Sequence, residues 1–582
     1  MFINFYSFIF LGLFTHMESH HESYYSQMMK QHNQVEQLRR EKADRKRKRS
    51  GDGKTQLKLC VSGNNNQISV DRRLDPDLQN RWDAAVVEFV SETGVSFEVC
   101  SKLDILLRSI SPNGRLRVKV KNSNTVSSHV SKMSIGLKVD VYSIIHADRD
   151  QTKSFAFTTD MWSSRALDSY MALTCHYING DFELVKLVPF IEYFGQNRHT
   201  GAHLRVMMDQ FMSALGLEGE EFMKYVVCDN ASNNVVMIRL SNGIIKDYRC
   251  AIHTLALCVK AIFQLEILTV KVQTCISKCN EVAKYVRRSE HNKNELREAC
   301  KTLRIGFIMP KKPVDTRWNS VEANVTSVLR LMPALQHLST HDETLGWSGI
   351  VPNAAEAKVL ESLVDILTQI KIASKKWEGE KEPTLQSVIP ELWNVKDTLE
   401  KKINAHERYV STFAKQLKRL ILERFPSWGT ENPLTSMAHF LDPEFQGLVL
   451  KQFPGAFNKT QEEIKKVAAK YCGQNEPRLQ ARIVRTNSDE NDNLTATQRL
   501  KLSQTVVNET EGNNDGNRSR IEIELDKYLN IKIDHCSNIL TFWKDNQDIF
   551  PVLTLVAKEV LAIPASSASS ERVFSVGSLV SF

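Results

Sequence analysis

The 582-residue sequence has little glycine and proline, with 24 and 16 residues respectively, and it contains no internal repeat. This composition excludes a collagen-like chain. With 42% hydrophobic and 25% charged residues, the composition is that of an average globular protein and also excludes wholesale disorder. At roughly 100 to 200 residues per domain, the length predicts about three to five domains.

Closely paired cysteines are also absent. The eleven cysteines are scattered and odd in number, a pattern typical of reduced thiols in a cytosolic or nuclear protein. Before residue 80 there is no C-x2-4-C pair followed by paired histidines, and Cys60 and Cys100 have no partners at zinc-finger spacing. We therefore expect no zinc finger, and the composition excludes a disulfide-rich miniprotein.

Long hydrophobic runs are confined to Met1–Phe14, which lacks a basic region before it and a small-residue cleavage site. The run is shorter than the ~20 residues that a membrane-spanning helix needs. We interpret it as an unusual N-terminus, and no other stretch could cross a membrane. The sequence predicts no membrane partner.

Positive charge is unevenly distributed. The net charge is +8, and the stretch from Arg39 to Lys54 holds nine Lys and Arg against three Asp and Glu, so 9 − 3 = +6 of it lies there. Its centre is a continuous basic run formed by Arg45, Lys46, Arg47, Lys48 and Arg49. Such a run is typical of nuclear import or nonspecific phosphate contact, and a purely solubilising tail is the alternative. We expect a nuclear protein.

The hydrophobic period changes along the chain. Helical spacing runs through 81–107 and 125–146, with basic residues at 115–121 that form either a basic surface or an ordinary solvated edge. After residue 150 the pattern predicts three strands, a helix, a strand, a helix, a strand and a helix, at 154–160, 169–178, 182–193, 200–215, 225–228, 233–240, 248–251 and 253–263. Three antiparallel strands followed by this alternation is the order of a ribonuclease-H-like fold.

The remainder is helical, with apolar stripes at 354–372, 385–403 and 410–425. Residues 486–520 are polar and predict a flexible linker, after which dense apolar residues resume. We expect a fold of the α/β plus α class: a basic tail at 1–54, a helical domain at 55–148, the first part of the ribonuclease-H-like core at 149–263, a helical insertion at 264–485, the linker, and a C-terminal region at 521–582.

Two acidic residues stand at the ends of predicted strands. Asp160 follows the first strand and Asp229 the fourth, and in a ribonuclease-H-like sheet these two ends are neighbours. Facing carboxylates at this edge would hold Mg²⁺ or Mn²⁺, which prefer oxygen ligands and promote phosphoryl transfer. The alternative is that each aspartate only caps a turn or helix, and Asp229 to Ser232 would be a good helix cap.

Five blocks in order resemble the hAT superfamily of DNA transposases, in particular its branch with BED-type zinc fingers. They are Thr158 to Ser164 (TTDMWSS), Cys228 to Asn234 (CDNASNN), Cys250 to His253 (CAIH), Thr316 to Asn319 (TRWN) and Ile563 to Ser575 (IPASSASSERVFS).

The resemblance implies a DDE-type triad of Asp160, Asp229 and Glu571 that binds Mg²⁺ or Mn²⁺, with the long helical insertion between the last two acids. It implies that Arg317 and Trp318 approach DNA. For Cys250 and His253 it implies either half of a zinc site or, as we favour, a role in organising the active site. The end of the chain resembles the hAT C-terminal dimerisation region, with markers at Leu525, Tyr528, Leu529, Trp543, Phe550 and Leu553, whose apolar surface packs on the catalytic core, on a second subunit, or on both.

Two departures from the family bear on activity: the missing zinc finger, and the eleven residues after Glu571 where the resemblance implies a longer helix, as in a truncated chain. We expect a hAT transposase-like nuclear protein that forms homodimers or higher oligomers and binds DNA, with or without strand cleavage. One alternative is a domesticated, inactive DNA-binding regulatory protein, and another is a ribonuclease-H-like nuclease.

Overall fold

The computed structural model describes residues 79–86, 121–163, 169–194, 199–312, 318–341, 346–405, 407–471, 519–531 and 538–573. The predicted basic tail at 1–54, with Arg45 to Arg49, and most of the predicted linker lie outside these ranges. Residues 79–86 are helical, and the rest of the helix predicted at 81–107 also lies outside them. None of the helices in the described part of the chain is long and apolar enough to cross a membrane.

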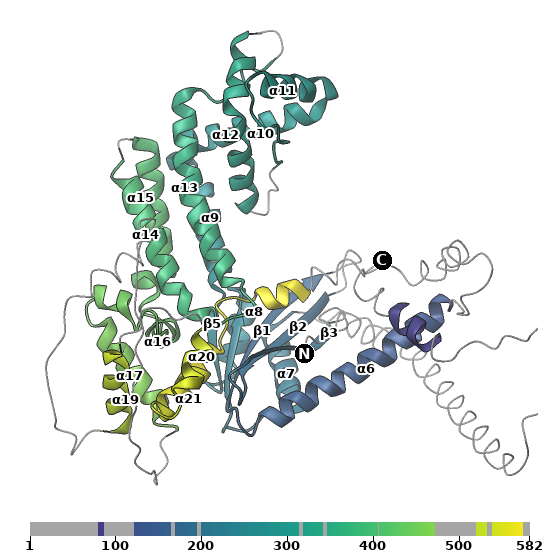
Figure 1. Ribbon diagram of the computed structural model, residues 1–582, viewed down its shortest axis with the longest axis vertical. Helices are drawn as coiled ribbons and strands as arrows, with labels where there is room; N and C mark the ends of the chain where they lie inside the picture. The colour runs from purple at the N-terminus through teal and green to yellow at the C-terminus, as the bar shows by residue number, and fades with distance from the viewer. Residues whose placement is uncertain are drawn as a thin grey trace, which may run out of the picture.

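A five-stranded sheet forms the centre of the molecule, in the order β3-β2-β1-β4-β5 (Figure 1). β1 is antiparallel to β2 and parallel to β4, and β5 is parallel to β4. The strands span Ser154–Ser163 (β1), Ser169–Ile178 (β2), Leu184–Tyr193 (β3), Met223–Cys228 (β4) and Ile245–Arg249 (β5). The predicted alternation of strands and helices is therefore observed, with boundaries that differ by a few residues.

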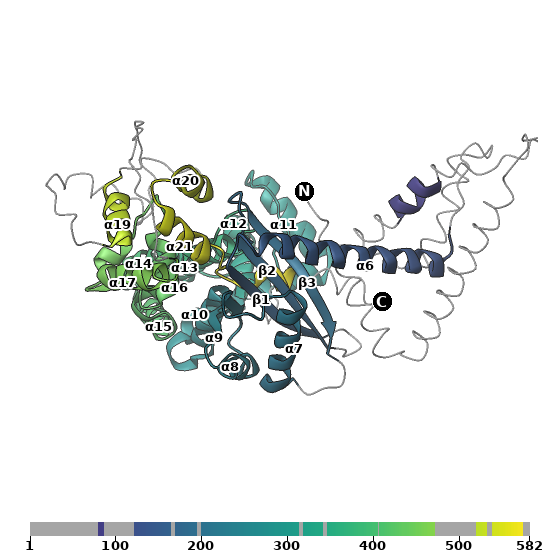
Figure 2. The same ribbon diagram turned by 90° about the horizontal axis from the view of Figure 1, so that it is seen from below.

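Helices cover both faces of the sheet (Figure 2). Alternate side chains of a strand point to opposite faces, and in β1 Phe155 and Phe157 enter one core while Ala156 enters the other. The first core is covered by α6 (Ser123–Asp148), α7 (Gly201–Ala214) and α8 (Ser232–Arg239), and the second by α9 (Ala251–Gln264) and α21 (Pro551–Leu561). Burial on both faces explains why the strands are so apolar.

The hairpin between β2 and β3 is longer than the sequence predicts. The third strand was expected to begin at 182, but Phe182 is buried with a positive φ of 63°. The side chain of Asn179 accepts hydrogen bonds from the backbone N–H groups of Asp181 (3.0 Å) and Glu183 (2.9 Å). This side-chain-stabilised turn holds residues 179–183 out of the ladder, so β3 begins at Leu184.

Helices make up the chain from residue 251 to 471 in its described parts, and no strand occurs there. In Figure 1 the helices α10 to α12 form an arm that extends away from the sheet, with α13 running back from it and α14 and α15 beside it. The bounds are Glu266–Arg288 (α10), Glu290–Thr302 (α11), Trp318–His341 (α12), Ala354–Trp377 (α13), Val388–Ile403 (α14), Arg408–Arg424 (α15), Pro433–Phe440 (α16) and Ala456–Ala468 (α17). The helix expected from 385 begins at Val388, after a 3₁₀ turn over Leu385–Ser387.

The C-terminal helices α19 (Arg520–Asn530), α20 (Ile539–Asp545) and α21 return to the sheet and to α16 and α17 (Figure 1). The buried carboxylate of Glu524 in α19 accepts hydrogen bonds from the backbone N–H groups of Val552 (3.1 Å) and Leu553 (2.8 Å), at the start of α21. These N–H groups have no partner within their own helix, so the glutamate satisfies them and joins α19 to α21.

Candidate acidic site

The register of the sheet places Asp160 and Asp229 on one face. In the parallel ladder Thr158 lies opposite Val227, so each aspartate stands two residues beyond this pair on its own strand. Two residues along a strand return to the same face, and this face holds the core made by Ala156, Tyr225 and Val227. The two carboxylates therefore leave neighbouring strands at the carboxyl edge, toward α9 and the C-terminal segment.

Local hydrogen bonds hold both aspartates. The Asp160 carboxylate accepts a hydrogen bond from the backbone N–H of Met161 (2.8 Å). Asp229 Oδ1 accepts from the backbone N–H of Ala231 (2.9 Å) and from Asn234 Nδ2 (2.7 Å). The expected side-chain cap of the following helix is not formed, because the N-cap residue of α8 is Ala231. Asp229 is instead oriented by the side chain of Asn234, in the first turn of α8.

Glu571 reaches this edge because the segment before it is joined to the start of α9. The backbone N–H of Ala251 donates to the Ala565 carbonyl (2.9 Å), and that of Ser567 donates to Cys250 Sγ (3.4 Å). Residues 568–573 then form a helical turn that carries Glu571. Hydrogen bonds thus join the start of α9 to the segment before Glu571, although the helical insertion separates them in the sequence.

The three acids influence one another electrostatically. Burial raises the pKa of Asp160 to about 7; the Met161 hydrogen bond opposes this shift, and the charges of Glu571 and Asp229 add to it. Glu571 keeps an exposed side chain, yet the protein around it removes enough water to raise its pKa, and the nearby His253 opposes that shift. Like charges are therefore concentrated at this edge.

Carboxylate oxygens are the donors that Mg²⁺ and Mn²⁺ prefer, and a cation would offset the repulsion by Glu571 and Asp229 that adds to the effect of burial on the pKa of Asp160. In the described residues, however, no three His, Cys, Asp or Glu side chains are close enough together to hold a metal ion. The acids share one region without forming a finished ligand cluster.

Cys250 is a buried structural residue in this arrangement. It is the N-cap of α9, where its sulfur accepts hydrogen bonds from the backbone N–H groups of His253 and Ser567, each at 3.4 Å. Burial raises the pKa of the thiol, which disfavours the thiolate that zinc would require. Cys250 thus positions the segment that carries Glu571, and His253 lies near the glutamate itself.

The remaining predicted site residues have different outcomes. Arg317 lies outside the described residues, and of Trp318 only the backbone is described, as the first residue of α12. The six dimerisation markers lie inside the chain's own core: Leu529 is partly buried and the others are at most 3% exposed. Tyr528 donates its hydroxyl to the Phe440 carbonyl (3.0 Å) and Trp543 its indole N–H to that of Leu441 (3.1 Å). These side chains therefore contribute to the core of the single chain, and their role in a dimer stays a prediction.

Sequence reasoning missed two contributors to the site. Arg249, at the end of β5, donates from Nη1 to the Asp229 carbonyl (3.2 Å), and Asn234 fixes the Asp229 carboxylate. Asn234 lies in one of the sequence blocks quoted above and Arg249 directly precedes another, but only the folded sheet shows that they contact Asp229. The sequence did offer one signal: Arg249 lies in a predicted strand, and Asp229 directly follows the predicted strand before it.

Three regions of the chain match known protein families. The chain matches the family described as the ZBED1 RNase-like domain over residues 158–249, the ZBED1 RNase-like helical domain over 248–366, and the hAT family C-terminal dimerisation region over 524–581. Asp160 and Asp229 fall in the first match and Glu571 in the last.

Whole-chain relatives include a protein named as an AC transposase of Zea mays, 26% identical over 497 residues, covering 79% of this chain and 58% of that protein. They also include the Arabidopsis thaliana zinc finger BED domain-containing protein DAYSLEEPER, 22% identical over 441 residues, covering 72% of this chain and 59% of that protein. The chain thus spans less than two thirds of the length of these relatives.

The fold and the matches define the class: a transposase-like protein with a ribonuclease-like domain, a helical domain and a dimerisation region. The matched regions and the relatives support a transposase-like protein similar to the hAT superfamily, in the branch related to BED-type zinc finger proteins.

Proposed function

We propose that the chain acts on DNA in the nucleus as a homo-oligomeric, metal-dependent DNA strand-cleaving and strand-transfer protein. The observation that carries this proposal is the placement of the three acids: Asp160 near the end of β1, Asp229 directly after the neighbouring β4, and Glu571 in a segment hydrogen-bonded to the start of α9. Homo-oligomerisation is supported by the dimerisation region at 524–581. The basic run Arg45 to Arg49 supports the nuclear localisation in this proposal.

The three carboxylates would hold Mg²⁺ or Mn²⁺, which supplies Lewis acidity to a phosphoryl oxygen when it is bound. The chain's own residues have separate tasks. Asp160, whose backbone neighbour Met161 donates to its carboxylate, would be one of the oxygen ligands of the cation. Asn234 and Arg249 keep Asp229 and its backbone in place. His253, beside Glu571, favours the charged form of that glutamate.

The test is nicking of terminal-repeat DNA by the purified full chain with Mg²⁺ or Mn²⁺. We expect cleavage by the wild type and its loss in Asp160→Asn, Asp229→Asn and Glu571→Gln. The matched control is Asp209→Asn, which changes an exposed carboxylate paired with Arg205 on α7. Wild-type activity equal to that of the three variants would overturn the catalytic proposal.

A second candidate is a catalytically silent DNA-binding protein that uses the same fold. The absence of a chelating cluster among the described residues favours it. It predicts DNA binding that is unchanged in the three acid variants and needs no divalent cation. The nicking assay and a binding assay on the same proteins separate the two candidates.

A further inference from the structure

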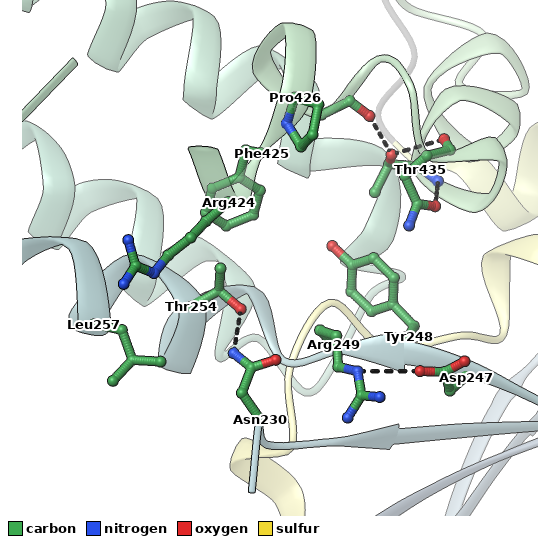
Figure 3. A pocket seen from close by; sticks show the side chains of 12 residues that line it. Asn230, Asp247, Tyr248, Arg249, Thr254, Leu257, Arg424, Phe425, Pro426 and Thr435 are labelled. Atoms are coloured by element: carbon green, nitrogen blue, oxygen red, sulfur yellow. Dashed lines mark hydrogen bonds and ion pairs between the residues drawn. The ribbon is translucent and has the colours of Figure 1, made fainter. Parts of the chain in front are cut away.

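A second cavity lies beside the acidic site, at the carboxyl ends of β4 and β5. Its volume is about 530 Å³, and it is enclosed by β5, the first turns of α9 and the segment that links α15 to α16 (Figure 3). Ligand pockets typically have about 300 to 1,000 Å³, and ligands of open α/β sheets bind at the carboxyl ends of the strands. We call this cavity the Tyr248 pocket.

Tyr248 provides a polar group that the fold leaves without a partner. Its side chain is only 4% exposed, and its hydroxyl points into the cavity (Figure 3). No group among the described residues forms a hydrogen bond with this hydroxyl. The hydroxyl faces the cavity, so a water molecule or a ligand with a hydrogen-bonding group in the pocket can pair with it.

The charge of the pocket favours an anion. Arg424, the last residue of α15, donates from Nη1 to the Leu420 carbonyl (3.5 Å) and lies against the Cys258 thiol, and it has no carboxylate partner in the described part of the chain. Arg249 pairs with Asp247 at 3.1 Å. The lining therefore carries two positive charges and one negative charge, and guanidinium groups are suited to binding phosphate through two parallel hydrogen bonds.

The far wall of the pocket has an unusual backbone. Ser427, Trp428 and Gly429 have consecutive positive φ values of 47°, 58° and 86°. This conformation is unfavourable for the two non-glycine residues, and it is held by buried hydroxyls: Thr435 donates to the Gly429 carbonyl and Ser436 to the Thr430 carbonyl, both at 2.7 Å. Strain that is held in place in this way is typical of binding sites.

The pocket also adjoins the acidic site. Asn230, which lines it, directly follows Asp229, and Arg249 contacts both the pocket and the Asp229 carbonyl. On the other side, α15 leads away from the pocket with a net charge of 5 − 1 = +4, from Arg408, Lys415, Lys418, Arg419 and Arg424 against Glu423. A polyanionic strand could thus pass from α15, across the pocket, to the acids.

We propose that the Tyr248 pocket binds one unpaired nucleotide of the DNA strand that passes the acidic site, with a phosphate on Arg424 and Arg249 and the base in the part lined by Phe425. This inference rests on the proposed action on DNA, and it adds where one nucleotide of the DNA strand would bind. A single nucleotide matches the size, the mixed polar and apolar walls and the charge of the pocket, whereas a base pair within a duplex is too wide to enter.

The test measures binding of the full chain to a fluorescent single-stranded oligonucleotide, to the blunt duplex of the same sequence, and to the free mononucleotide dAMP as competitor. For the single strand we expect Kd to rise about fivefold in Tyr248→Phe and about tenfold in Arg424→Ala, the sizes expected for one neutral and one charge-assisted hydrogen-bonded contact. Binding of the blunt duplex should not change.

The matched control is Arg288→Ala, because Arg288 is also an exposed arginine that ends its helix, α10, in the arm away from the sheet (Figure 1). Tyr248→Phe keeps the ring, so it serves as the test if Arg424→Ala unfolds. In addition, a strand that carries 5-iododeoxyuridine should crosslink on irradiation to the peptide with Tyr248 or with Phe425.

The outcomes are distinct. Unchanged single-strand affinity in both pocket variants, or crosslinks only elsewhere, overturns the pocket while leaving DNA action intact. A wild type that binds no DNA overturns both proposals. Weaker strand binding in the pocket variants without any nicking supports the pocket and rejects only the catalytic proposal.

Discussion

Asp160 is a residue that the fold holds where its charged form is disfavoured. Its pKa of about 7 results first from burial and then from the charges of Glu571 and Asp229. Between the unfolded pKa of about 3.9 and this value, the native state binds more protons than the unfolded state, so the contribution of Asp160 to stability falls as the pH rises. Such opposition between function and stability is common at active sites.

We therefore expect Asp160→Asn to stabilise the protein, by about 2 kcal/mol at pH 8 and by less at pH 5, because the amide cannot ionise. The asparagine keeps an oxygen for the Met161 N–H group. Chemical denaturation at the two pH values measures the gain, with Asp209→Asn as the control. A loss of stability, or a gain that does not depend on pH, would contradict the electrostatic account.

Cys250 belongs to a Cys-x-x-His motif that suggests metal binding, but its observed contacts are structural. Its sulfur accepts two backbone hydrogen bonds in a fully buried position. We expect Cys250→Ala to lower the free energy of unfolding by about 2 kcal/mol, because two N–H groups lose their acceptor, while Cys250→Ser should lose less than about half of that. A zinc ligand would behave differently: both variants would then be equally damaging, and a chelator would lower the Tm of the wild type.

At the scale of elements, α21 is the helix that fastens the C-terminal region to the sheet. Its Glu559 is buried and accepts hydrogen bonds from the hydroxyls of Tyr225 on β4 and of Tyr471 (2.6 Å), with Lys470 Nζ at 3.5 Å. Three segments distant in sequence thus meet at one carboxylate. A fully satisfied buried network of this kind specifies how elements pack.

Comparing the loss of the Glu559 carboxylate with the loss of a surface carboxylate measures how much the buried network contributes to the free energy of unfolding. We expect Glu559→Ala to cost about 3 kcal/mol, because two buried hydroxyls lose their acceptor and a cavity forms. Glu463→Ala, which removes a surface pair with Lys466, should cost no more than about 1 kcal/mol. Urea denaturation with unchanged m-values measures both, and equal losses would show that the network adds nothing.

At the scale of the whole molecule, the C-terminal region is part of the monomer's own core. Its helices complete the core that covers one face of the sheet, and its last segment carries Glu571 to the acidic edge. Deleting residues 521–582 would therefore damage the fold as well as any dimer. A surface change is needed to study assembly separately.

Leu555 offers that change. In the described part of this region it is the only large hydrophobic residue classed as exposed, at 37%. We expect the wild type to have at least twice the chain mass of 66.4 kDa in light scattering, and Leu555→Asp to shift it toward the monomer with little loss of Tm, because exposed apolar residues gain most from an interface. Leu553→Asp, in the core, should instead unfold the protein. An unchanged mass in Leu555→Asp would exclude α21 from the interface.

The amino-acid sequence by itself determined the order of strands and helices, because apolar periodicity is a local property that survives without tertiary information. It also placed Asp160 and Asp229 at strand ends. Only the tertiary structure decided what the long-range contacts do: that Cys250 caps α9 and holds the Glu571 segment, that Tyr528 and Trp543 are buried within one chain, and that Tyr248 and Arg424 line one cavity. These contacts join residues far apart in the chain, and no local pattern records which distant surfaces will meet.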